Sequence, residues 1–107
     1  MLTDITSAQI DGSFVPVRRG SVASVEIGGE GVLLDQITIK VHLLDPIANV
    51  VWSCMDGSGT IDELAADLSD AFGVSLEQVR RDILVLATEL GRRGLLEGVI
   101  AEQEDVS

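Results

Sequence analysis

The change of side-chain pattern at Asp45-Pro46 constrains the fold more than any other feature of this sequence. Before it, apolar residues alternate with polar ones or form short runs around glycines, whereas after it they recur every three or four residues. The first spacing is typical of β-strands and the second of α-helices. An Asp that can cap a helix, followed by Pro at the first helical position, is a favoured helix start. The sequence therefore predicts an α+β fold in which a sheet precedes the helices.

Three antiparallel strands are expected before this point. Residues 24–27 and 32–35 are apolar runs on either side of Gly28-Gly29-Glu30-Gly31. Glycine reaches positive φ angles without a steric cost, so this arrangement indicates a hairpin. A phosphate-binding loop would need the Lys and Ser/Thr that the turn lacks. Residues 38–43 alternate with β-branched side chains, which predicts the third strand, and residues 15–25 could add an edge strand.

Three helices are expected from Asp45-Pro46 onward, and each begins with a capping signal. Asp45 opens the first, Thr60 with Glu63 the second, and Ser75 with Gln78 the third. Apolar residues at helical spacing should form the buried faces: Ile47, Val50, Val51, Cys54 and Met55 in the first helix; Ile61, Leu64, Ala65, Leu68 and Phe72 in the second; Leu76, Val79, Ile83, Leu86, Ala87 and Leu90 in the third. Gly73 and Gly94 end the last two helices. The result is a winged helix-turn-helix-like arrangement beside a small sheet.

The length of 107 residues allows one hydrophobic core and therefore one domain. We expect this domain to span residues 15–100, with a flexible N-terminal tail over 1–14 and an acidic C-terminal tail over 101–107. A formal charge of -11 opposes binding to nucleic acid and to anionic membranes, because both depend on Lys and Arg. A basic partner would be attracted, although such a charge also serves solubility alone.

Cys54 is the only cysteine, so the chain can form no internal disulfide and holds no cysteine cluster for zinc. Residues 1–13 lack the basic start and apolar run of a secretory signal, and no segment reaches the roughly 18 apolar residues of a membrane span. These features predict a cytoplasmic protein.

The residues that catalysis would need are scarce. His42, the sole histidine, lies on a predicted strand as an edge or packing residue, and Cys54 lies in an apolar helical stripe as a small buried side chain. The acidic residues of the second helix fall on its solvated side, and no calcium loop is present. The Asp-Ser-Leu of acyl carriers is also missing. We therefore predict neither enzymatic activity nor a cofactor or metal.

Residues 25–98 resemble the PqqD family, the stand-alone form of the recognition element for ribosomally synthesised precursor peptides. The resemblance consists of an ordered series of short motifs: Val32-Leu33-Leu34-Asp35; His42-Leu43-Leu44; Ala48, Trp52 and Asp56-Gly57; Thr60, Glu63-Leu64-Ala65 and Leu68; Asp82-Ile83, Leu90 and Gly94-Leu95-Leu96. The chain departs from the family pattern at Asp45, where Asn is usual. Both residues cap helices, so the fold is not affected.

The resemblance implies a domain that binds the leader segment of a precursor peptide by strand addition and presents it to a modifying enzyme, such as a radical-SAM enzyme, a cyclase or a protease. In the family the peptide lies between the third strand and the third helix. The corresponding positions here are Thr38, Ile39, Lys40, Val41, His42 and Leu43 on the strand, and Val79, Asp82, Ile83, Leu86 and Glu89 on the helix. Asp82 and Glu89 would meet basic leader residues. The protein would be a monomer or a weak dimer.

Other interpretations stay open at this stage. The third strand could be paired on both sides, and the apolar residues of the third helix could be plain core. A winged-helix DNA-binding regulator is the main rival, because Arg80, Arg81, Arg92 and Arg93 lie on the helix that would read DNA. The negative charge and the short tail after Gly94 weigh against it. A third possibility is a structural subunit that binds an enzyme but no peptide.

Overall fold

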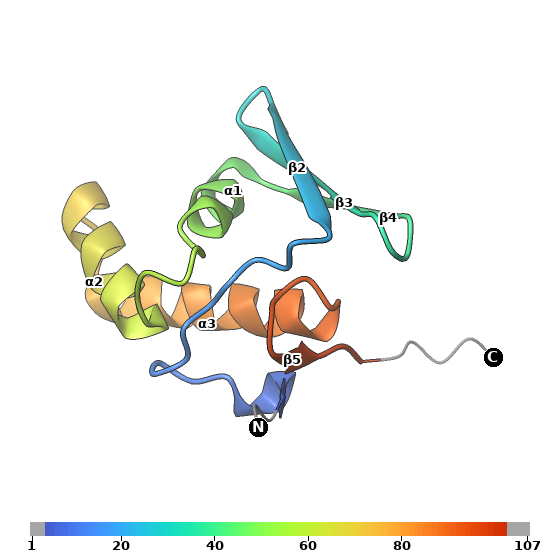
Figure 1. Ribbon diagram of the computed structural model, residues 1–107. Helices are drawn as coiled ribbons and strands as arrows, with labels where there is room; N and C mark the ends of the chain where they lie inside the picture. Colours follow the sequence, from blue (N-terminus) through green and yellow to red (C-terminus); the bar gives the residue numbers. More distant parts are fainter. Residues whose placement is uncertain (1–3, 103–107) are drawn as a thin grey trace.

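A three-stranded antiparallel sheet and three helices make up most of the computed structural model, which describes residues 4–102 (Figure 1). The elements, in chain order, are β1 (Ile5–Thr6), the 3-10 helix η1 (Ser7–Gln9), β2 (Val22–Ile27), β3 (Glu30–Asp35), β4 (Lys40–Leu44), α1 (Pro46–Ser53), α2 (Ile61–Phe72), α3 (Leu76–Arg92) and β5 (Val99–Ile100). The predicted order of a sheet followed by three helices is confirmed.

The sheet has the strand order β2-β3-β4, with antiparallel pairing throughout. Gly28 and Gly29 turn the β2-β3 hairpin with φ angles of 60° and 86°, which side chains with a Cβ rarely adopt. Gly31 serves a different purpose, because a Cβ there would collide with the side chain of Asn49 on α1. Glycine thus lets α1 approach the inner face of β3.

The predicted helix starts are confirmed. The Asp45 carboxylate accepts a hydrogen bond from the Ala48 amide at 2.8 Å, and Thr60 and Glu63 form a reciprocal capping box. The Ser75 hydroxyl accepts from the Gln78 amide at 3.3 Å. These bonds satisfy amides that the first helical turn leaves without a partner. Gly73, with a φ of 66°, ends α2 in the left-handed conformation, as expected.

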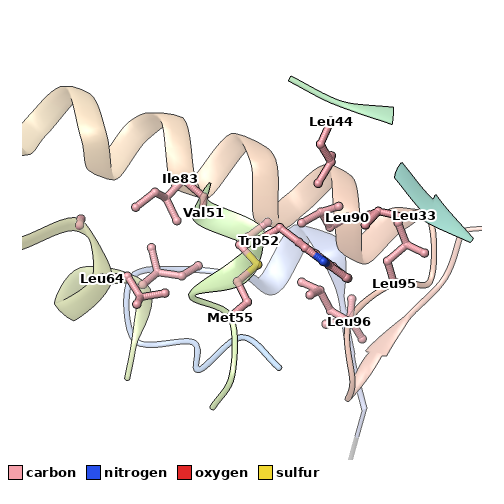
Figure 2. Close-up of a cluster of buried hydrophobic side chains, with 14 residues drawn as sticks. Leu33, Leu44, Val51, Trp52, Met55, Leu64, Ile83, Leu90, Leu95 and Leu96 are labelled. Carbon is pink, nitrogen blue, oxygen red and sulfur yellow. The ribbon is translucent and has the colours of Figure 1, made fainter. Parts of the chain in front are cut away.

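The core lies between the inner face of the sheet, the helices and the segment after α3. Trp52 is 2% exposed at its centre, and Figure 2 shows Leu33, Leu44, Leu90, Leu95 and Leu96 around its ring. The core cluster of buried hydrophobic residues in the described part of the chain is Leu33, Leu44, Val51, Trp52, Met55, Ile61, Leu64, Ala65, Ile83, Ala87, Leu90, Leu95, Leu96 and Val99.

Four predicted core residues are exposed instead. Ile47, Val50, Phe72 and Leu76 have exposed fractions of 79%, 41%, 63% and 51%. All four lie on the margin of their helical stripe or in a terminal turn, where helical spacing alone does not decide which residues the neighbouring elements cover. Trp52, which the predicted stripe of α1 omitted, is buried in its place.

Residues 5–14, which the sequence assigns to a flexible tail over 1–14, make contacts with the rest of the fold. β1 pairs in parallel with β5, with Ile5 opposite Val99. Ser7 is 3% exposed, and Ile10 and Phe14 pack against the core. The described residues of the predicted C-terminal tail are Ala101 and Glu102, and Glu102 forms an ion pair with Arg92 at 2.8 Å. The remainder of that predicted tail, like residues 1–3, lies outside the described part.

Candidate functional site

β4 leaves one of its two edges open. Among residues 4–102 it pairs only with β3, which lies between β2 and β4 in the sheet. The interpretation that this strand is paired on both sides is therefore wrong for the described chain. The backbone N–H and C=O groups along such an edge are free to pair with another extended chain.

The strand begins later than predicted. Thr38 and Ile39 belong to the turn between β3 and β4, and Ile39 has a positive φ of 59°. Asp35 causes this turn: its carboxylate accepts hydrogen bonds from the amides of Ile37 at 3.0 Å and Thr38 at 3.4 Å. An Asp side chain that binds the backbone two residues later favours a turn over a strand. The prediction that Thr38 and Ile39 are strand residues is therefore wrong.

The two faces of β4 differ in their surroundings. Lys40, His42 and Leu44 lie opposite Asp35, Leu33 and Gly31, which are all buried, so this face is turned toward the helices. Leu44 is 7% exposed at the end of the row.

Val41 and Leu43 lie on the other face of β4 and are 60% and 69% exposed. They share this outer face with Val25 and Leu34, which are also exposed. A chain added at the open edge would thus meet polar groups toward the helices and an apolar surface on the opposite side.

Four predicted residues of α3 share one accessible flank of the helix with Arg93. Val79, Asp82, Leu86, Glu89 and Arg93 are spaced three, four, three and four residues apart, which places them on one side of a helix. None of the five is fully buried. We call this row the α3 flank. Ile83 is 1% exposed and belongs to the core, so its contact with a peptide stays a prediction.

Arg93 joins the α3 flank to β4. Its Nη1 lies 3.4 Å from Nδ1 of His42, and its Nε donates to Glu89 at 3.0 Å. This contact places the Arg93 end of the α3 flank next to β4. Arg93 was not among the predicted site residues, because its contact with His42 spans 51 positions in the chain. Helical spacing from Glu89 could have indicated it.

The charges near this end of the edge are arranged around His42. Burial, and after it the charge of Arg93, lowers the pKa of His42 below its usual value. Asp35 acts in the opposite direction, and Lys40 lowers the pKa further. Glu89 already accepts hydrogen bonds from Arg92 and Arg93. Asp82 has no ion-pair partner among residues 4–102.

The part of the chain that the structure describes holds no group of three or more His, Cys, Asp or Glu residues that could bind a metal ion. Cys54 is half-buried as a free thiol. None of the helices described is both long and apolar enough to span a membrane.

A comparison with known families matches the part of the chain that contains β4 and α3. The model of the family described as coenzyme PQQ synthesis protein D (PqqD) matches residues 30–96, more than half of the chain. The PqqA binding protein of Rhizobium meliloti (strain 1021) is 32% identical over 71 residues, which are 66% of this chain and 70% of that protein. The chain belongs to the PqqD family. The match extends from β3 to the segment after α3, so it includes both β4 and the α3 flank.

Two solved structures have the same fold. TbiB1 in complex with the TbiA(beta) leader peptide superimposes with a TM-score of 0.69 and 27% identity, over 77% of this chain and 95% of that one. Lasso peptide synthetase B1 complexed with the leader peptide gives a TM-score of 0.68 at 20% identity, over 78% and 98% of the two chains. The PqqD-like fold predicted from the sequence is confirmed.

Proposed function

We propose that this PqqD-family chain binds the leader segment of a ribosomally synthesised precursor peptide as an added strand on β4. The observation that carries the proposal is the open edge of β4 beside the accessible α3 flank. Strand addition obtains affinity from backbone hydrogen bonds and specificity from the side-chain contacts next to the edge.

The α3 flank explains why β4 is favoured over the other edge of the sheet. β2 also has an open edge in the described residues, but it lies on the far side of β3 from β4, whose residue His42 contacts Arg93 of the flank. A peptide on β4 would place alternate side chains toward Leu86 and its neighbours on the flank. The other side chains would continue the apolar outer face beside Val41 and Leu43. Lys40 through Leu43, with Val79, Asp82, Leu86, Glu89 and Arg93, form the proposed contact surface.

The relatives support this function. One is named for binding PqqA, and two solved proteins of the same fold hold leader peptides. We further propose that the chain acts without catalysing a reaction and passes its peptide to a separate modifying enzyme, a radical-SAM enzyme, a cyclase or a protease. A cytoplasmic location remains a prediction from the sequence.

DNA binding is disfavoured by the charges on α3. Arg80 is paired with Asp62 at 2.6 Å, Arg92 with Glu102, and Arg93 with Glu89. Affinity for DNA depends on cations that can displace counterions from phosphates. Three of the four arginines of the would-be recognition helix already have carboxylate partners, in a chain of net charge -11.

The proposal is tested by NMR titration of the ¹⁵N-labelled protein with the N-terminal half of any short peptide encoded beside its gene. Amide shifts should gather at residues 40–44 and along the α3 flank, whereas β2 and α2 should change little. A dissociation constant near 1 μM would correspond to about -8 kcal/mol, which strand pairing with a few buried anchors can supply.

Two results would contradict the proposal. Shifts that gather at β2 would move the binding site to the other edge. A peptide concentration of about 1 mM is far above the dissociation constant expected of specific recognition. If the spectrum stays unchanged at that concentration of every such peptide, the result would favour an enzyme subunit that holds no peptide of its own.

A further inference from the structure

Cationic groups gather where β4 lies next to the Arg93 end of the α3 flank. The chain has only seven Lys and Arg residues and one His, against eighteen Asp and Glu residues. Arg93 contacts His42 at 3.4 Å, and Lys40 lies two residues from His42 on the same face of β4. Three of the eight basic groups of this acidic chain therefore lie together at one end of an open strand edge. Such a cluster indicates a role in binding.

The geometry leaves hydrogen-bond donors available there. The guanidinium of Arg93 has donors but no acceptor, so Nδ1 of His42 must accept in their 3.4 Å contact. The ring proton of the neutral imidazole is therefore on Nε2, which has no hydrogen-bond partner among residues 4–102. Lys40 is exposed and has no ion-pair partner among residues 4–102.

The nearby carboxylates are already engaged. Asp35 on β3 is 5% exposed and accepts the amides of Ile37 and Thr38. Glu89 on α3 accepts from Arg92 and Arg93. Neither carboxylate binds Lys40 or the free ring nitrogen of His42 in the described structure. An incoming carboxylate would therefore find two unoccupied donors, with Arg93 next to them.

We propose that Lys40, His42 and Arg93 form a subsite for one acidic side chain, Asp or Glu, of the bound leader peptide. This inference rests on the proposed function and deepens it, because it names the side-chain chemistry that the proposed contact surface selects at its Lys40 end. It also fixes the direction of the peptide along β4. The Asp82 end of the flank carries a carboxylate that has no ion-pair partner in the described part of the chain, so it repels the same acidic residue.

The subsite predicts a dependence of binding on pH. Burial, Arg93 and Lys40 lower the pKa of His42 in the free protein, while Asp35 raises it. Glu89, on the facing helix, is held by the two arginines. A leader carboxylate beside the ring favours the protonated imidazole, so peptide binding raises the pKa of His42. By linkage, the peptide then binds more tightly as the pH falls from the pKa of His42 in the complex to its pKa in the free protein.

The experiment compares two charge-neutralising variants with the same leader peptide. Lys40→Gln removes a subsite cation, and Arg81→Gln removes an exposed cation of α3 that lies outside the flank. Fluorescence anisotropy measures the affinity of the N-terminal half of the neighbouring precursor, and of versions with each Asp or Glu changed singly to Asn or Gln. Lys40→Gln should weaken binding about five-fold, the upper range for an exposed ion pair, and Arg81→Gln much less.

Neutralising one particular acidic residue of the peptide should weaken binding by the same factor. Measuring that neutralised peptide against Lys40→Gln should show little further loss of affinity, because the two changes remove the same interaction. The ring signals of the single histidine provide a second readout. The unmodified peptide should raise the pKa of His42, and the neutralised peptide should not.

Several results would overturn the subsite while leaving the proposed function intact. Equal losses for Lys40→Gln and Arg81→Gln would show a general charge effect. The subsite would also be refuted by a peptide scan that finds no sensitive acidic position. A leader that has no acidic residue and still shifts the amides of β4 would refute it as well. If no peptide shifts β4 at all, the proposed function itself fails.

Discussion

Two adjacent leucines of β4 should respond very differently to truncation. Leu44 is 7% exposed and contributes to the core, whereas Leu43 is 69% exposed on the outer face. Leu→Ala removes the equivalent of about three methylene groups, worth ~0.8 kcal/mol each when buried. For Leu44 this transfer loss is about 2.2 kcal/mol, and the cavity left behind brings the cost to about 3.5 kcal/mol. For Leu43, with a third of its surface buried, the loss is about 0.7 kcal/mol.

Urea unfolding measures both values. Trp52 is the only tryptophan and is 2% exposed, so its emission reports the loss of the core directly. With an m-value of about 1.5 kcal/mol/M, Leu44→Ala should lower the midpoint by about 2 M and Leu43→Ala by about 0.5 M. Equal midpoints for the two variants would refute the assignment of the faces of β4, and with it the orientation of the proposed peptide site.

Three further predictions concern caps, turns and pH. Thr60→Ala should cost about 1 kcal/mol because it removes the hydroxyl that caps α2, while Thr60→Ser should cost little; a thermal melt compares them. Gly73→Ala should destabilise by roughly 1–2 kcal/mol because α2 ends there at a φ of 66°, whereas Gly20→Ala, with open space around it, should be near neutral. Burial raises the pKa of Asp35, but hydrogen bonds from the amides of Ile37 and Thr38 outweigh it and hold the pKa below its usual value. The resulting stability is present above the unfolded-state pKa and is lost as the pH falls through the folded-state value, so Asp35→Asn should flatten the acid side of a stability curve against pH.

The helix caps and the hairpin could be predicted because their signals are local. Thr60 binds an amide three residues away, and Gly28 and Gly29 occupy a turn that few other residues can adopt. The start of β4 was misplaced for a local reason as well. The alternation of residues 38–43 suits a strand, but the carboxylate of Asp35 binds the amides that follow it and delays the strand by two residues.

The features that the sequence did not reveal depend on contacts between distant segments. β1 is two residues long and pairs with β5, at the other end of the chain, so it leaves no periodic pattern. Arg93 reaches His42 across 51 positions. That contact places the end of α3 beside β4, and the helical spacing of Val79, Ile83 and Leu86 could not separate core residues from accessible ones.

Hydrogen exchange of the β4 amides, followed by NMR with and without the leader peptide, tests strand addition most directly. In an antiparallel ladder, alternate amides of β4 point to β3 and the others to the open edge. The edge-facing amides should exchange fast in the free protein and become strongly protected in the complex, while the edge-facing amides of β2 stay unchanged. A bound peptide that leaves the β4 edge unprotected, or protects β2 instead, would contradict strand addition at β4.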